Sequence, residues 1–308
     1  MSNNYEPQVN VDLGVASVTF SDTALETTII AQGIAAGTYT NGVLVENIGN
    51  DPDAGKDLCG AGSEGHLMIQ AFKAVNKKSK LNAIIVDASA TGVAATSDLV
   101  FSGTPTESGS LFITVGSYIN NRYEVKITTA STVTTIGDDI EAQINADPNS
   151  PVTASNAAGT VTLTAKTKGT AGNGITIISD GTIAGITVTV TAFASGANDP
   201  VITTPLSLLE DKLTDIISPV ANIAAIRTHL DNKFNVNNNV IAGVGIFTET
   251  NTYANLVTAL APATLVSRNV VKFNVKLANE TLHKGSSIPE LDVVKTAEFA
   301  AYRALRSV

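Results

Sequence analysis

The chain has 308 residues, a length that suits one large domain or two to three smaller ones. Hydrophobic residues make up 44% of it and charged residues only 15%, against about 25% charged residues in an average soluble domain. This composition supplies a core, which argues against intrinsic disorder. The 19 Lys and Arg residues against 28 Asp and Glu residues give a net charge of −9, which argues against general binding to nucleic-acid backbones.

Cysteine and histidine usage excludes two further classes of site. Cys59 is the only cysteine, so the chain closes no disulfide of its own and lacks the ligands of a thiolate zinc site. His66, His229 and His283 are scattered, and their spacing indicates no metal cluster. The sequence shows neither an apolar run of about 18 residues nor a signal peptide. We therefore expect no membrane-spanning helix, and synthesis in a cytoplasm-like compartment.

Residues 1–93 combine a polar start with an α/β pattern. Residues 1–20 are irregular and are predicted to form an N-terminal arm, and residues 21–93 are predicted to be the first part of an α/β body. A helix is expected at 63–76, from apolar residues at helical spacing. Short strands are expected at 27–31, 42–46 and 81–87, the last an apolar run typical of a sheet buried on both faces.

Residues 94–199 have a different composition, with 21 Thr residues between positions 91 and 200. Apolar residues alternate with polar ones in 122–127, 160–165 and 186–192, which indicates half-buried antiparallel strands. One helix is expected, with Thr135 as its cap and a buried stripe of Ile136, Ile140 and Ile144. We predict an inserted β-rich outer domain with one helix.

Residues 200–308 return to alternating helices and apolar strands, and are predicted to be the second part of the α/β body. Such alternation indicates a mostly parallel sheet with flanking helices. A capping box at Ser287 and Glu290 marks the start of the last helix. The other predicted helices are 206–213, 221–234 and 253–260, and the predicted strands are 215–219, 240–246 and 270–275.

The turn Gly60-Ala61-Gly62-Ser63-Glu64-Gly65 matches the dinucleotide-binding pattern G-x-G-x-x-G. A helix follows it, and Asp87 stands at about the distance expected of a ribose-binding acid. That pattern also needs a strand that runs directly into the glycines, and residues 51–58 cannot be a buried strand. We expect a helix-start turn capped by Ser63. A dinucleotide-binding enzyme that uses the Gly60–Gly65 loop is retained as an alternative.

The same turn is close to the nucleophile-elbow pattern G-x-S-x-G. Ser63 would need His229 or His283 as its base, and nothing in the sequence specifies either. His66 lies three residues after Ser63, at a spacing that permits contact on one helix. The simpler interpretation makes His66 a helix residue near a sheet edge.

Other chemically suggestive residues have structural interpretations. The acid pairs Asp138-Asp139 and Glu210-Asp211 point in different directions on a helix, which suits solvated faces better than acid–base chemistry. Cys59 has no evident basic neighbour and is expected to be a small packing residue. We therefore assign no catalytic, cofactor-binding or metal-binding residue and expect a protein that is not an enzyme and has no cofactor.

Short motifs spread over roughly residues 30–275 resemble the contractile-tail sheath proteins of Mu-like bacteriophages. Cys59 replaces the aromatic residue of the family's Leu-Phe-Gly-x-Gly-Ser turn. The motifs are, in chain order, Ile29-Ile30-Ala31-Gln32-Gly33, Ala36-Gly37-Thr38, Leu58-Cys59-Gly60-Ala61-Gly62-Ser63, Ser102-Gly103-Thr104, Gly109-Ser110-Leu111, Ile140-Glu141-Ala142-Gln143-Ile144-Asn145-Ala146, Pro151-Val152-Thr153-Ala154, Val161-Thr162-Leu163-Thr164-Ala165-Lys166, Gly169-Thr170-Ala171-Gly172-Asn173 and Asp199-Pro200.

This resemblance implies a structural subunit of the phage virion, made in the host bacterial cytoplasm. Such subunits stack as hexameric rings around a tail tube and contract to drive the tube through a cell envelope. The implied partners are identical subunits and the tube protein, with baseplate and tail terminator proteins as further candidates. Direct nucleic-acid contact and membrane insertion are not implied. A phage or bacterial surface adhesin-type module is a further alternative, favoured by the Thr-rich strands.

The family pattern continues beyond the helix at 289–304 into a C-terminal domain and arm. This chain lacks a counterpart of that continuation, which indicates either a truncated chain or a short variant. Extended terminal arms commonly add strands to neighbouring sheets. Residues 1–20 are expected to serve as such an arm.

Overall fold

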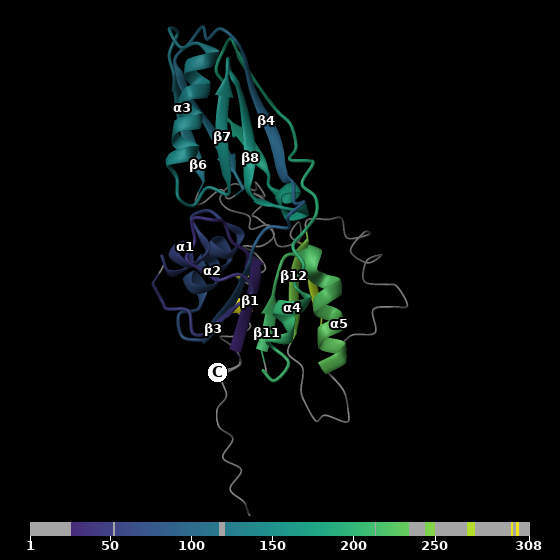
Figure 1. Cartoon of the computed structure of the whole chain (residues 1–308). Coiled ribbons are helices and arrows are strands. Elements are labelled where there is room, and N and C mark those ends of the chain that lie inside the picture. Colours follow the sequence, from purple (N-terminus) through teal and green to yellow (C-terminus); the bar gives the residue numbers. More distant parts are fainter. Residues whose placement is uncertain are drawn as a thin grey trace, which may run out of the picture.

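The computed structural model describes residues 26–51, 53–116, 121–212, 214–233, 244–249 and 270–274, together with Ala297, Ala300 and Ala301. The expected mixed α/β class is confirmed, because the described residues combine helices with several β-sheets. One of these sheets has six strands. It lies with its flanking helices in the lower half of Figure 1, and the other two sheets lie with α3 (Val133–Ala146) in the upper half.

The six-stranded sheet has the order β13-β12-β11-β1-β3-β2. All neighbouring strands run parallel except β2, which is antiparallel to β3. Every residue of β3 is buried, as expected of a parallel strand covered on both faces. The strands are β1 (Glu26–Gln32), β2 (Leu44–Val45), β3 (Leu81–Val86), β11 (Thr214–Ile217), β12 (Gly245–Glu249) and β13 (Val270–Asn274).

Helices cover both faces of this sheet (Figure 1). Ile29 of β1 packs in one buried cluster with α1, α2 and the helical residues Ala297, Ala300 and Ala301. The next residue, Ile30, packs in a second cluster with α4 and α5. Alternate residues of β1 therefore stabilise opposite layers. The helices are α1 (Ala54–Cys59), α2 (Glu64–Val75), α4 (Thr203–Ser207) and α5 (Ile223–Lys233).

Residues 94–199 form two antiparallel sheets and the helix α3 (Val133–Ala146). The four-stranded sheet has the order β10-β4-β8-β7, and the three-stranded sheet has the order β6-β5-β9. The inner faces of both sheets and α3 enclose one hydrophobic core. The strands are β4 (Ala94–Gly103), β5 (Gly109–Val115), β6 (Arg122–Ile127), β7 (Val152–Ala157), β8 (Thr160–Lys168), β9 (Ile177–Asp180) and β10 (Ile186–Val190).

The helix in this segment has the predicted buried stripe but a different cap. Ile136, Ile140 and Ile144 are at most 2% exposed. The prediction of Thr135 as the cap was wrong, because the helix starts one turn earlier. The Thr132 side chain accepts a hydrogen bond from the backbone N–H of Thr135, and the Thr135 side chain accepts one from the backbone N–H of Thr132. This reciprocal pair is a capping box in which threonine stands in the usual place of Glu or Gln.

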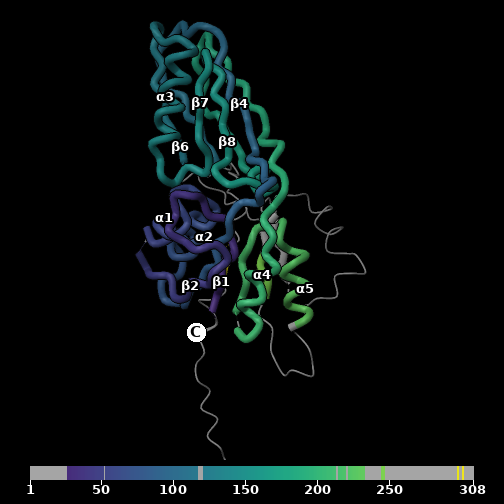
Figure 2. Tube along the Cα trace, viewed as in Figure 1, coloured from purple at the N-terminus to yellow at the C-terminus, as the bar shows by residue number. Residues whose placement is uncertain are grey.

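The chain enters and leaves the 94–199 segment at adjacent points. Figure 2 traces the outgoing and returning parts of the chain side by side above the six-stranded sheet. The N–H of Val93 donates to the carbonyl of Ala197 over 2.9 Å, and the N–H of Ala197 donates to the carbonyl of Val93 over 3.2 Å. A second bridge joins Thr96 to Ala194. The two connections therefore form a short ladder of their own.

Four predicted elements beyond residue 200 differ from the structure or lie wholly or partly outside its described part. The helix predicted at 206–213 was misplaced: α4 spans Thr203–Ser207, with Pro205 in the first turn, where its missing N–H costs nothing. The strand predicted to begin at 240 begins at Gly245, and residues 240–243 lie outside the described residues. So do the helices predicted at 253–260 and from Ser287, apart from Ala297, Ala300 and Ala301.

Candidate functional site at the junction of the sheet and residues 94–199

The Gly60–Gly65 turn joins α1 to α2, so no strand runs into it. Gly60 and Gly62 have φ angles of +85° and +76°, a region that favours glycine. Ser63 caps α2 as predicted, and its Oγ accepts a hydrogen bond of 3.2 Å from the backbone N–H of His66. The glycines therefore shape a tight turn between two helices.

The turn faces the 94–199 segment, which fills the space in front of it. A Cβ atom on Gly62 would lie 2.0 Å from the carbonyl oxygen of Ser150. Lys166 Nζ donates a hydrogen bond of 3.3 Å to the carbonyl oxygen of Ala61. A dinucleotide fingerprint uses its glycines to let a pyrophosphate approach the backbone. Here another part of the same chain makes that approach, which argues against a dinucleotide at this turn.

The carboxyl end of β1 is also occupied by the 94–199 segment. The Gln32 side-chain Nε2 donates to the carbonyl oxygen of Lys168 over 3.1 Å, and Gln32 Oε1 accepts from the N–H of Lys168 over 2.7 Å. Open α/β sheets usually bind ligands at the carboxyl ends of their strands. In this chain the side chain of Gln32 reaches the end of β8 there instead.

Apolar packing strengthens the same contact. Leu67 of α2 belongs to the core enclosed by the sheets of residues 94–199, and it is 7% exposed. Its neighbours Met68 and Ile69 belong to the core beneath the six-stranded sheet. Helix α2 therefore contributes to both cores. We call the contact made by Gln32, the Gly60–Gly65 turn and Leu67 with residues 150 and 166–168 the junction.

A buried carboxyl group lies within the junction. Glu64, the first residue of α2, is 8% exposed, and its Oε2 accepts a hydrogen bond of 3.4 Å from the backbone N–H of Gln32. The buried Oε1 has no hydrogen-bond partner. Burial raises the pKa of Glu64 from 4.5 to about 8, and the negative charge of Asp199 acts in the same direction. The carboxyl is thus mainly protonated at neutral pH.

Ser63 and His66 lie together but do not form a nucleophile–base pair. Ser63 Oγ contacts the backbone of His66, and the His66 Nδ1 atom accepts a hydrogen bond of 2.9 Å from the N–H of Gly62. Burial lowers the pKa of His66 to about 4, so its ring is neutral at pH 7. His229 lies on α5 across the sheet from α2, and His283 lies outside the described residues.

Asp87 and Asp138 make structural hydrogen bonds, and Cys59 is buried. Asp87 accepts a hydrogen bond of 2.8 Å from the Tyr39 hydroxyl. Asp138 accepts one of 2.7 Å from Asn156 Nδ2. Burial raises the pKa of the Cys59 thiol to about 12, which opposes formation of a nucleophilic thiolate. Within the described part of the chain, no three His, Cys, Asp or Glu side chains gather in a way that could hold a metal ion.

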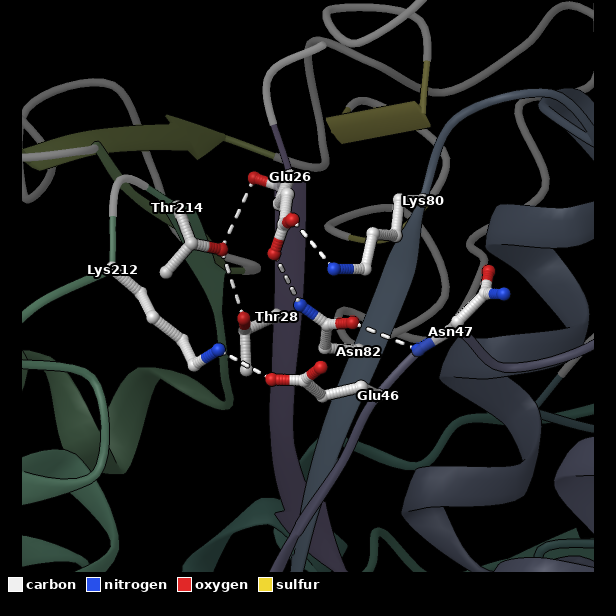
Figure 3. Close-up of polar contacts among 8 residues, drawn as sticks. All are labelled: Glu26, Thr28, Glu46, Asn47, Lys80, Asn82, Lys212 and Thr214. Carbon is white, nitrogen blue, oxygen red and sulfur yellow. Dashed lines mark hydrogen bonds and ion pairs between the residues drawn. The ribbon is translucent and has the colours of Figure 1, made fainter. Parts of the chain in front are cut away.

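A polar cluster ties the strands together at the opposite end of the sheet, where the parallel strands begin (Figure 3). Glu26 of β1 accepts hydrogen bonds from Lys80 Nζ over 2.6 Å and from Asn82 Nδ2 over 2.8 Å. Asn82 Oδ1 in turn accepts from the N–H of Asn47 over 2.9 Å. Asn82 is fully buried, and its amide therefore connects β1, β3 and the chain that follows β2.

The same cluster extends to β11. The hydroxyl groups of Thr28 and Thr214 are 2.8 Å apart, and Thr214 Oγ1 donates to the carbonyl oxygen of Glu26 over 3.1 Å. Lys212 and Glu46 form an ion pair at the rim (Figure 3). Two carboxylates are matched by two ammonium groups, so the cluster is locally neutral. These contacts give the cluster a structural role.

Part of the chain is similar in sequence to part of a phage tail sheath protein. No family model matches it. Over 150 residues it is 30% identical to the Mu-like prophage FluMu tail sheath protein of Haemophilus influenzae, a match that covers 47% of this chain and 30% of that protein. The chain resembles Mu-like tail sheath proteins. The resemblance expected from the short motifs is thereby confirmed.

Two solved structures are also similar to the chain. A sheath tail protein of Listeria innocua is 14% identical with a TM-score of 0.32, and the match covers 91% of this chain and 56% of that one. A sheath tail protein of Desulfitobacterium hafniense is 12% identical with a TM-score of 0.36, and the match covers 99% of this chain and 61% of that one. The chain thus spans less than two thirds of each of these three relatives. Among the described residues, no helix has the length and apolarity to cross a membrane.

Proposed function

We propose that this chain is a structural subunit of a contractile phage tail sheath, located in the virion. Copies of it stack as hexameric rings around a tail tube and contract to drive the tube through a cell envelope. The observation that carries the proposal is the 30% identity with the Haemophilus tail sheath protein over 150 residues. The proposed partners are identical subunits and the tube protein, with baseplate and tail terminator proteins at the two ends.

The junction supports a mechanical role over a catalytic one. The turn that resembles a nucleotide cradle is packed against Ser150 and Lys166, and the buried groups beside it are a neutral imidazole and a mainly protonated carboxyl. We assign no catalytic residue, cofactor or metal. Residues 94–199 are proposed to be an outer domain inserted into an α/β body made of residues 21–93 and 200–308. Residues 1–20, which lie outside the described residues, are proposed to be an arm.

Electron microscopy of the purified full-length gene product tests assembly. Tubes built of stacked rings, or single rings with six-fold symmetry, are the expected result. A monodisperse monomer at every protein concentration and salt condition tried would contradict the proposal. A second experiment co-expresses the chain with the tail tube protein of the same genome. In sedimentation of the assembled tubes, the sheath subunit should sediment with them.

Calorimetric titration distinguishes the proposal from the dinucleotide-enzyme alternative. We expect no heat of binding with NAD or NADP at millimolar concentration, because Ser150 lies where the pyrophosphate would approach Gly62. Binding of either dinucleotide in the micromolar range would contradict the proposed function and favour the dinucleotide-binding enzyme.

A further inference from the structure

The buried carboxyl of Glu64 is the least satisfied polar group that the junction contains. One of its oxygens, Oε2, receives the backbone N–H of Gln32 at 3.4 Å, a long hydrogen bond, and Oε1 has no partner. Burying a carboxylate without a cationic partner has a high desolvation free energy, whereas burying a neutral carboxyl has a much lower one. The closed junction therefore favours the protonated form of Glu64 over the ionised form.

The charged groups around Glu64 reinforce this preference. Asp199, in the returning connection, accepts hydrogen bonds from the N–H and the hydroxyl of Thr170 over 2.7 and 2.8 Å, which hold its carboxylate in place. Its charge disfavours a second negative charge at Glu64. From β1 the group that contacts Glu64 is the backbone N–H of Gln32, and the neutral side-chain amide of Gln32 pairs with the backbone of Lys168.

We propose that opening of the junction releases the proton of Glu64, so that rising pH loosens the contact between the six-stranded sheet and the 94–199 segment. When Gln32 separates from Lys168, water reaches the Glu64 carboxyl, which then ionises as an ordinary glutamic acid does. The closed junction binds one proton more than the open one. This coupling is a property of the single chain and does not depend on sheath assembly.

The pKa values set the pH window in which the effect is visible. The pKa of Glu64 is about 8 when closed and 4.5 in its ordinary state, so opening becomes more favourable as pH rises from 4.5 to about 8 and levels off above. His66 acts oppositely below pH 6.5, because its closed pKa of about 4 makes opening take up a proton there. Burial lowers the pKa of Lys166 and raises that of the Cys59 thiol to about 12. Because the opposing contribution of His66 fades above pH 6.5, the interval from pH 6.5 to 8 is where the effect of Glu64 is measured.

Hydrogen exchange measures the opening directly. The reporters are the backbone amides of Gln32 and Lys168, which donate to Glu64 and to Gln32 respectively. After division by the intrinsic exchange rate, the opening constant of wild type should rise about tenfold from pH 6.5 to 8. In Glu64→Gln, which keeps the size but cannot ionise, the rise should vanish. The control Glu210→Gln removes an exposed carboxyl and should keep the rise.

Two outcomes overturn the proposal: an opening constant in wild type that is flat with pH, or a rise that persists in Glu64→Gln. Should Glu64→Gln fail to fold, the wild-type protein still decides the matter. Carbon-13 NMR of the Glu64 carboxyl should show a titration midpoint near 8, and a midpoint near 4.5 would rule out the coupling.

Discussion

The side chain of Gln32 pairs with both backbone groups of Lys168, 136 residues further along the chain. Gln32 is the last residue of β1 and Lys168 is the last residue of β8. The amide side chain of Gln32 therefore connects the mostly parallel sheet to an antiparallel sheet by hydrogen bonds. Gln32 is 2% exposed, and its polar atoms are therefore largely shielded from water. The pair fixes the 94–199 segment against the sheet.

Replacing Gln32 with leucine should destabilise the protein by about 2 kcal/mol, because it leaves the N–H and carbonyl of Lys168 without their partners. Urea denaturation measures the loss. The matched control is Gln143→Leu, since Gln143 Nε2 also donates to a backbone carbonyl but at an exposed site. That variant should stay within about 0.5 kcal/mol of wild type. Equal losses in the two variants would show that the Gln32 pair has no special weight.

Leu67→Ala should cost about 3 kcal/mol, since the removed side chain leaves a cavity in the core of the 94–199 segment. Leu67 is anchored in α2, so we expect the segment and the sheet to unfold together in wild type and to separate into two transitions in the variant. Circular dichroism and limited proteolysis during denaturation follow both parts. Leu208→Ala, at a residue 45% exposed, is the control and should change neither stability nor cooperativity.

Gly62→Ala and Gly42→Ala form a pair that separates backbone strain from steric conflict. The φ angles are similar, +76° and +69°, so each substitution costs about 1 kcal/mol from the left-handed conformation. At Gly42 the nearest atom to an added Cβ is Pro205 Cγ at 3.6 Å, an ordinary contact. At Gly62 the new Cβ meets Ser150 O at 2.0 Å and should cost about 2 kcal/mol more. Similar melting temperatures for the two variants would contradict the close packing of Ser150 against Gly62.

His66→Asn should remove an acid-sensitive contribution to stability. The pKa of His66 is about 4 when folded and 6.5 ordinarily, so the unfolded state gains a proton first as pH falls. The stability that the neutral ring contributes is complete above pH 6.5 and is lost as pH falls towards 4, by up to tenfold in the unfolding constant per pH unit. The difference between wild type and variant isolates this effect from that of Glu64. A difference independent of pH would contradict it.

In the cluster at the strand starts, the buried amide should matter more than the exposed ion pair. Asn82→Ala removes the group that links Glu26 to the N–H of Asn47 and should cost about 2 kcal/mol. Lys212→Ala breaks the rim ion pair with Glu46, and we expect no resolvable change in the unfolding free energy. Thermal melts at low and high salt check both, since only an exposed pair should respond to salt.

Local sequence patterns predicted most of the described elements. The apolar run at 81–87 identified the fully buried strand β3, and Ser63 was correctly placed at the start of α2, because caps and apolar runs are local signals. The cap of α3 was displaced by one turn because Thr132 and Thr135 are both good capping residues three positions apart. Only their reciprocal hydrogen bonds distinguish them.

The junction could not be predicted, since its residues carry no local mark. Leu67 follows the helical spacing of α2 and looks like one more member of the stripe that faces the sheet. Its true neighbours lie in strands that come later in the sequence. Gln32 likewise resembles an ordinary strand end, and Glu64 an ordinary first-turn acid. The G-x-G-x-x-G match identified the turn that takes part in the junction. It suggested dinucleotide binding, however, which the packing of Ser150 against Gly62 opposes.

Because Val93 and Ala197 are joined by backbone hydrogen bonds, we expect that the segment between them can be replaced by another domain. For a chain that departs and returns at hydrogen-bonding distance, the length between the two points matters little, because each doubling of that length costs only about 0.6 kcal/mol in closure entropy. We expect a foreign module grafted between these two positions to leave β3 and β11 in register on either side of β1. The recipient surface that a graft must match is small: one leucine, one glutamine and a glycine turn.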